Sequence, residues 1–277
     1  MRMFSPDLVP VARHRLVQQL PEPLFDAVLT QHLYRYLDFT TKLEVLVVNR
    51  TALGIALGTI GVAVPEQMRH DAFKIYCDEA YHALFSNDMR MQVQHRTGVK
   101  PLLPEKPYFM TRLRHLQQQK PEQRDLLEIL FVIVSETLIS ATLANAPDDP
   151  TVAGAVRQMI DDHAIDEGRH HAYFAHFLTH LWASLPRNLR IQAALAVPDL
   201  ILAFLAPDRP AIHAELRQHG MRNDDAHQVI SEVFGDDTVT SYARATARQT
   251  IRHFTQLGAL ELPGVAEQFH DRGLLIG

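Results

Sequence analysis

Two glutamates lie inside the most apolar segments of this 277-residue chain. Glu44 precedes a Val-Leu-Val-Val run at residues 45–48, and Glu136 follows a run at 129–134 that is apolar throughout. An unpaired carboxylate in such surroundings costs several kcal/mol of folding free energy. The chain must therefore fold so that each of these groups is paired, protonated or bound to a metal.

Apolar residues recur with a period near 3.6 along most of the chain, and alternating strand patterns are almost absent. Proline and glycine divide the sequence, as where Pro65 opens a segment that Gly98 closes. We expect an all-α fold with helices at 22–36, 39–63, 66–97, 109–118, 121–145, 151–183, 187–205, 209–219, 224–234 and 238–258. Three prolines in residues 100–107 predict an extended connection across the end of a bundle, and residues 146–151 predict a tight loop.

A repeated motif adds further ligand-type side chains. The pattern Asp-Glu-x-x-His occurs at residues 78–82 and again at 166–170, and one isolated glutamate, Glu44 or Glu136, precedes each copy. Residues three apart share a helix face, so the Glu and His of each motif aim at one point. Four helices that each bring one carboxylate, with two imidazoles, form the cage of carboxylate-bridged di-iron bundles.

Charge balance favours two metal ions at this point. Four converging carboxylates cannot all ionise unaided, whereas two divalent cations balance them and neutral imidazoles complete the coordination. The predicted ligands are Glu44, Glu79, His82, Glu136, Glu167 and His170. The alternative is two chance motifs on solvated helix faces, but both motifs follow a buried glutamate in the same order.

The residues beside the ligands have expected roles of their own. Asp78 and Asp166 are placed to accept hydrogen bonds from the outer N–H of the histidine in the opposite motif, and Arg169 to neutralise them. Ordinary solvated helix positions are the alternative for all three. His163 precedes Glu167 by four residues, so a third imidazole points at the metal site unless it is part of a polar surface.

These residues carry a family resemblance over about residues 25–185. Their order and approximate spacing resemble the ligand set of the p-aminobenzoate N-oxygenase family of di-iron enzymes, in which a third histidine is characteristic. The seven positions are Glu44, Glu79, His82, Glu136, His163, Glu167 and His170. The resemblance implies that His163 is a ligand. It also implies a ferritin-like helical bundle with a four-helix di-iron core, and C-terminal helices at about 187–260, in a single domain of residues 1–277.

The function that the resemblance implies is a non-haem di-iron monooxygenase of secondary-metabolite biosynthesis. It would use two iron ions, O₂ and an external reductant or electron donor protein to convert a primary amine to a hydroxylamine, nitroso or nitro product. The substrate would be an arylamine or amino-acid amine, free or tethered to a carrier protein. Tyr36 is a candidate for substrate contact, and Arg244 or Arg248 for binding a carboxylate. A core tyrosine and surface arginines are the alternatives.

Other functions remain open at this stage. A di-iron hydroxylase or oxidase would act on carbon, and a non-catalytic ferritin-like protein would store iron. Tyrosines at 76, 81 and 173 flank the ligands and leave a radical-generating role open, although that type of protein lacks the third histidine. Apolar side chains that could line an amine pocket are Leu37, Val132, Leu138, Ile139 and Leu143.

Composition argues against several partners. The 27 basic and 32 acidic residues form no basic block, so neither nucleic acid nor an anionic membrane surface is an expected partner. The apolar stretch 43–64 contains Glu44 and Arg50 and is not expected to span a bilayer. The single cysteine, Cys77, suits a reducing compartment, so we expect a cytoplasmic protein. Residues 191–205 are apolar on all sides and are expected at the centre of the fold or in a homodimer interface.

Overall fold

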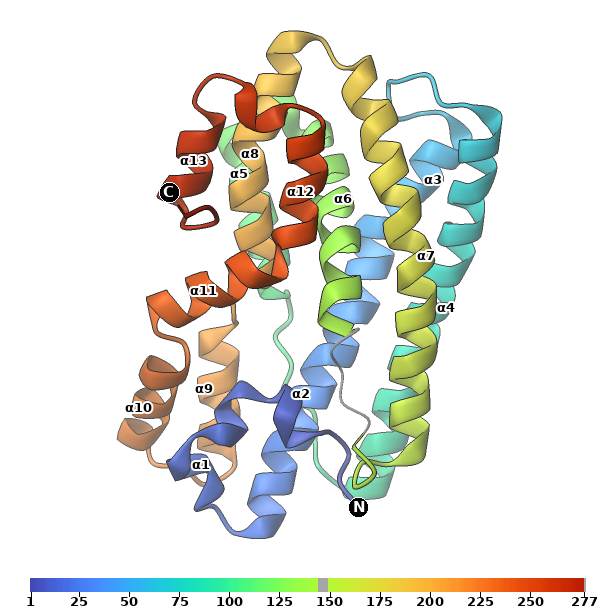
Figure 1. Cartoon of the computed structure of the whole chain (residues 1–277). Helices are drawn as coiled ribbons and strands as arrows, with labels where there is room; N and C mark the ends of the chain where they lie inside the picture. Colours follow the sequence, from blue (N-terminus) through green and yellow to red (C-terminus); the bar gives the residue numbers. More distant parts are fainter. Residues whose placement is uncertain (144–148, 277) are drawn as a thin grey trace.

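Four long helical rods form the centre of the molecule. The structure, a computed structural model, describes residues 1–143 and 149–276, without the side chains of residues 140–143. The rods are α2 (Glu22–Leu43) with α3 (Asn49–Leu57), α4 (Glu66–Thr97), α6 (Arg124–Leu143) and α7 (Gly154–Ser184). They stand side by side in Figure 1, where α2 and α3 contact α4, α6 contacts α7, and α4 contacts α7. The expected all-α fold with a four-helix core is confirmed.

Shorter helices cover one side of this core (Figure 1). They are α5 (Tyr108–Gln119), α8 (Arg187–Leu205), α9 (Arg209–Gln218), α10 (Asn223–Val233), α11 (Asp236–Thr246), α12 (Arg248–Gln256) and α13 (Val265–Asp271). The chain begins with two 3₁₀ turns, Pro6–Leu8 and Pro10–Arg13, and the short α1 (Arg15–Gln18), which contacts α10. The N-terminal residues and the C-terminal helices therefore meet at the same side of the bundle.

The first rod differs from the expected pair of helices at 22–36 and 39–63. It is continuous from Glu22 to Leu57 because no helix-breaking residue lies near position 38, and it contains one π-helical turn at Glu44–Val48. A π turn inserts one extra residue and so shifts which side chains face the core. Glu44 is fully buried at the start of this turn, whereas the side chains that follow it, Val45 and Leu46, are exposed. The rod ends at Gly58, whose φ of 71° is left-handed.

The proline-rich segment is extended, as expected, but it runs along α2 rather than across the end of the bundle. The Gln31 side-chain amide donates to the carbonyl of Lys100 at 2.7 Å, and Lys42 Nζ donates to the carbonyl of Pro104 at 3.0 Å. Because α4 and α6 run in the same direction in Figure 1, the chain needs a long return between them. This segment and α5 provide that return.

Two other expectations change in detail. The helix expected at 238–258 is divided near Ala247 into α11 and α12. α7 begins at Gly154 rather than 151, because the Thr151 N–H bonds to the Asp149 side chain in a local turn. The end of the helix expected at 121–145 and residues 146–148 of the expected loop lie outside the described residues.

The apolar helix α8 lies in the interior. Within the described residues, one helical stretch, Arg187–Gln218, is long and apolar enough to cross a membrane by length and composition alone, with a mean hydropathy of 1.7. Half of that apolar window is buried inside the fold. Because α8 contacts α5, α6 and α13, it is a core helix, which is one of the two placements expected for residues 191–205.

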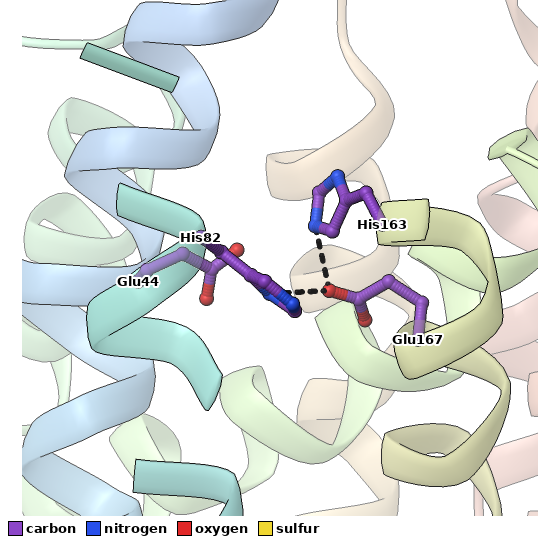
Figure 2. Close-up of side chains that lie close together, drawn as sticks. All are labelled: Glu44, His82, His163 and Glu167. Atoms are coloured by element: carbon purple, nitrogen blue, oxygen red, sulfur yellow. Dashed lines mark ion pairs between the residues drawn. The ribbon is translucent and has the colours of Figure 1, made fainter. Parts of the chain in front are cut away.

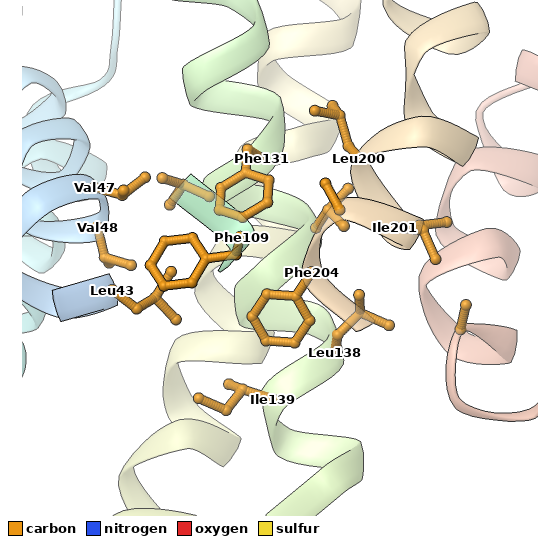
Figure 3. Packing of buried hydrophobic residues seen from close by; sticks show 14 of the residues in the cluster. Leu43, Val47, Val48, Phe109, Phe131, Leu138, Ile139, Leu200, Ile201 and Phe204 are labelled. Atoms are coloured by element: carbon orange, nitrogen blue, oxygen red, sulfur yellow. The ribbon is translucent and has the colours of Figure 1, made fainter. Parts of the chain in front are cut away.

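Aromatic side chains join the outer helices to the four-helix core (Figure 3). Phe109 of α5 stacks on Phe131 of α6 with ring centroids 6.0 Å apart, and Phe131 meets Phe204 of α8 at 6.3 Å. Phe39 of α2 packs edge-on against Phe109 and Phe204. The cluster fixes α5 and α8 against the helices that carry the buried glutamates.

Truncation inside this cluster should destabilise the whole fold. Phe131→Ala removes a fully buried ring and leaves a cavity, so we expect a loss of about 3–5 kcal/mol in the free energy of unfolding. Chemical denaturation followed by circular dichroism measures this loss. Phe73→Ala, at a position 41% exposed on α4, is the matched control and should change the value by about 0.5 kcal/mol or less. Equal losses in the two variants would contradict this description of the core.

Candidate metal centre

Seven acidic and imidazole side chains from four helical segments meet inside the four-helix core. They are Glu44 of the π turn, Glu79 and His82 of α4, Glu136 of α6, and His163, Glu167 and His170 of α7. All seven are at most 1% exposed. They form three overlapping groups, and within each group the potential ligand atoms lie within 4.8 Å of one another. We call these seven side chains the acidic cluster.

Imidazole nitrogens and carboxylate oxygens alternate through the acidic cluster. Glu167 Oε1 lies 2.8 Å from His163 Nε2 and 3.5 Å from His82 Nδ1 (Figure 2). The carboxylate of Glu79 bridges the other two histidines, with 3.0 Å to His82 Nδ1 and 2.9 Å to His170 Nδ1. All three imidazoles therefore turn one nitrogen toward the carboxylates.

Most of these inward atoms lack hydrogen bonds. Among the described residues, both carboxylate oxygens of Glu44, Glu136 and Glu167 find no hydrogen-bond partner, and neither does His163 Nε2. The contact between His163 and Glu167 is short, but its angles are not those of a hydrogen bond, so both atoms point at a shared space. Buried acceptors left in this state are costly, and cations would satisfy them. Carboxylate oxygens with imidazole nitrogens suit iron or manganese, and the overlapping groups fit two such ions.

The electrostatics of the acidic cluster point the same way. Burial and repulsion from neighbouring carboxylates raise the pKa values of Glu44 and Glu136 well above the ordinary range. Burial opposes the charged form of the histidines, but contacts with Glu79 and Glu167 outweigh it and raise the pKa of His82 to about 10. The pKa of His170 is raised to about 9 in the same way. Without metal ions, these shifts favour the protonated forms of Glu44, Glu136, His82 and His170.

The outer nitrogens of two histidines face aspartates on the neighbouring helix. His82 Nε2 lies 3.4 Å from Asp166 Oδ2, and His170 Nε2 lies 3.4 Å from Asp78 Oδ2. Arg169 Nη1 donates to the other carboxylate oxygen of Asp166 at 2.6 Å. A proton held on Nε2 by the aspartate leaves the Nδ1 lone pair directed at the acidic cluster. Each aspartate thus lies within hydrogen-bonding distance of the histidine of the opposite motif.

Tyr36 connects the acidic cluster to a cavity of about 330 Å³, which we call the inner cavity. Its hydroxyl lies 2.9 Å from His163 Nδ1, and burial raises the pKa of this phenol far above its ordinary value. Ile139, one helical turn after Glu136, also lines the inner cavity. The remaining walls include the rings of Phe39, Phe109 and Phe204 and the charged side chains of Arg35, Asp38 and Asp208.

The structure places Arg244 and Arg248 away from this cavity. Both line a separate hollow of about 410 Å³ beside residues 274–276, and Arg244 Nε donates to the carbonyl of Gly273 at 2.7 Å. Arg35 is the guanidinium at the inner cavity, and sequence reasoning missed it because its partner, Glu215, is distant in the chain. Of the apolar candidates, Ile139 lines the cavity, Leu37, Val132 and Leu138 are buried in the core, and the side chain of Leu143 lies outside the described residues.

Metal stoichiometry tests the acidic cluster directly. We expect the reduced, metal-free protein to bind about two Fe(II) or Mn(II) ions per chain, measured by elemental analysis after gel filtration. Glu136→Gln keeps the side-chain volume but removes one carboxylate, so it should clearly lower the number bound. Glu267→Gln, an exposed position on α13, is the matched control. Binding of one ion or none by the unmodified protein would contradict the dinuclear site.

Metal binding should also release protons. The raised pKa values favour the protonated forms of Glu44, Glu136 and two histidines, and entering cations must displace these protons. We expect roughly four protons per chain, detected with an indicator in weakly buffered solution. Apparent affinity should fall as the pH is lowered, because protons compete more strongly. Proton release below one per chain would show that the carboxylates are already ionised.

Comparisons with known proteins agree with this geometry. The profile of the p-aminobenzoate N-oxygenase AurF family matches residues 1–258, which include every helix of the acidic cluster. The 4-aminobenzoate N-oxygenase of Streptomyces thioluteus is 24% identical over 234 residues, covering 82% of this chain and 68% of that protein. The resemblance in the sequence and the expected ferritin-like bundle are confirmed. The chain belongs to the p-aminobenzoate N-oxygenase AurF family.

Proposed function

We propose that this protein is a di-iron monooxygenase that adds oxygen from O₂ to the nitrogen of a primary amine. Its membership of a family of N-oxygenases supports the reaction class. One structural observation carries the proposal for this chain: seven buried ligand-type side chains lie beside a cavity whose inner wall includes Tyr36, in contact with His163. A storage protein needs no such cavity for an organic molecule.

Two iron ions, when bound by the acidic cluster, supply the binding of O₂ and its reduction. The proposed ligands are Glu44, Glu79, His82, Glu136, His163, Glu167 and His170. For the first oxidation step, one oxygen atom joins the amine nitrogen and the other leaves as water. The balance requires two electrons and two protons, which an external reductant or an electron donor protein provides.

The residues around the acidic cluster hold it in one arrangement. We infer that Asp78 and Asp166 fix the two motif histidines, while Tyr36 holds the outer nitrogen of His163. If His163 binds metal through Nε2, its Nδ1–H donates to the Tyr36 oxygen. Complete burial keeps bulk water from the reacting oxygen, which limits unproductive release of reduced oxygen species.

The inner cavity suits a neutral amine. Its walls of Phe39, Phe109, Phe204 and Ile139 disfavour an ammonium group near the metal, and only a neutral nitrogen has the lone pair that the reaction uses. Aromatic walls also favour an aromatic ring through stacking and edge contacts. We therefore propose an arylamine as substrate, and the relative named for 4-aminobenzoate supports this choice. The second substrate class that we propose for the same reaction is an amino-acid amine, free or tethered to a carrier protein.

Location and assembly complete the proposal. We infer a cytoplasmic enzyme because its single cysteine, Cys77, is free and a reduced electron donor is needed. We also propose a homodimer. α8 is largely used in the core, so the surface of another helix would form the contact.

Product analysis tests the reaction. The iron-loaded, reduced protein is mixed with ¹⁸O₂ and a panel of arylamines and amino-acid amines, and products are identified by mass spectrometry. We expect one or two ¹⁸O atoms on the amine nitrogen, and no product with His170→Ala because a metal ligand is lost. The control variant Glu267→Gln should react like the unmodified protein. Label on carbon, or turnover of no amine, would overturn the proposal.

A further inference from the structure

The inner cavity lies next to a second, larger cavity. This outer cavity, about 860 Å³, lies between the N-terminal turns and the helices α9, α10 and α11. The two cavities share the lining residues His32, Arg35, Leu205, Asp208 and Tyr242. They are therefore neighbours: Arg35 and Asp208 line both cavities, and Tyr36 lines the inner one.

Negative charge predominates among the side chains that line the two cavities. The charged side chains that line the two cavities are the carboxylates Asp7, Asp38, Asp208 and Glu232 and the guanidinium groups Arg13 and Arg35. His32 adds no positive charge, because burial and the adjacent Arg35 lower its pKa well below the ordinary value. At the outer end, Arg13 lies 3.7 Å from Asp7, and Glu232 pairs with His14 at 2.8 Å.

The cation at the boundary between the cavities already has an anionic partner. Arg35 Nη1 lies 2.9 Å from Glu215 Oε2, and Glu215 is only 2% exposed. Asp208 is close enough to interact electrostatically with both members of this pair. The positive charge of Arg35 is thus already balanced by Glu215 and Asp208, and it is not free to bind the carboxylate of a substrate.

The two carboxylates that line the inner cavity, Asp38 and Asp208, differ in their partners. Asp38 Oδ2 accepts from Lys42 Nζ at 2.8 Å, one turn along α2. Asp208 Oδ1 accepts from the N–H of Ala211, because Asp208 caps α9. Among the described residues, no group donates a hydrogen bond to its second oxygen, so Asp208 is the surplus negative charge where the two cavities meet.

We propose that the amine substrate carries a second amino group, in its charged form, at the end remote from the nitrogen that is oxidised. The inference rests on the proposed function and specifies its substrate class. The charged end lies against Asp208, and the ring lies between the aromatic walls with the reacting nitrogen toward Tyr36. A carboxylate at the remote end, as in 4-aminobenzoate, meets repulsion from Asp208, and among the described side chains that line the cavities both guanidinium groups already face a carboxylate.

Ligand binding tests this charge preference without turnover. The probes are 4-aminobenzylamine, 4-aminobenzamide and 4-aminobenzoate, which share the ring but end in a cation, a neutral amide and an anion. Calorimetry uses the Mn(II)-loaded protein at pH 8, above the pKa of about 7 to which burial raises Glu215. We expect the cation to bind at least about tenfold more tightly than the anion, and added salt to reduce the difference. Tighter binding of 4-aminobenzoate would overturn the inference.

Two variants test which residues cause the preference for a cationic ligand. Asp208→Asn keeps the capping ability of this position but removes its charge, so it should reduce the cation-to-anion affinity ratio at least about fivefold. Asp224→Asn, an exposed residue on α10 outside both cavities, is the control and should leave the ratio unchanged. Glu215→Gln removes one of the two carboxylates that face Arg35 and should raise the affinity for 4-aminobenzoate. If that variant does not fold, Asp208→Asn alone decides, and an unchanged ratio there overturns the inference.

The two proposals fail in different ways. If 4-aminobenzoate binds best and is oxidised on nitrogen, the charge preference is wrong while the N-oxygenase function stands. If the cationic probe binds best but no amine gains oxygen on nitrogen, the function is wrong while the charge of the cavity is as described. Binding and product analysis therefore give separate answers.

Discussion

Four carboxylates buried in one apolar helical core are the constraint on which the rest of this structure depends. Each comes from a different helical segment, so the four rods cannot pack as they do without bringing the charges together. Protons relieve the repulsion in the metal-free protein, as the raised pKa values of Glu44 and Glu136 indicate. Metal ions relieve it further, so binding of metal and stability of the bundle are thermodynamically linked.

The helices beyond residue 187 add a cavity to the four-helix core. Phe204 and Leu205 at the end of α8, Asp208 at the start of α9 and Tyr242 of α11 all line the inner cavity. The Phe109–Phe131–Phe204 cluster holds α8 against α6, the helix that carries a cluster glutamate. Packing of the outer helices thus sets the shape of the cavity, while the inner rods set the positions of the ligands.

The acidic cluster was accessible from sequence because its signals are local. An i, i+3 spacing and a carboxylate in an apolar run can both be read within one helical turn, whatever the tertiary structure. The π turn at Glu44–Val48 was not accessible, since no residue type marks it. The Arg35–Glu215 pair joins residues far apart in the chain, so no periodicity reveals it. Arg244 and Arg248 are candidates for binding a carboxylate only through their position on the helix expected at 238–258. The break near Ala247 divides that helix and changes its direction.

Reaction and substrate choice therefore depend on different parts of the molecule. The ligand set admits little variation, because removing one carboxylate or imidazole changes the charge balance of a fully buried centre. The far end of the inner cavity, where Asp208 and Tyr242 lie, is partly open to solvent, so a change of charge at Asp208 leaves the ligand set intact. A relative that is 24% identical can keep the same ligand set while the charge at the far end of its cavity differs. In this chain, the pairing of Arg35 with Glu215 decides the sign of that end, and Asp208 leaves it negative.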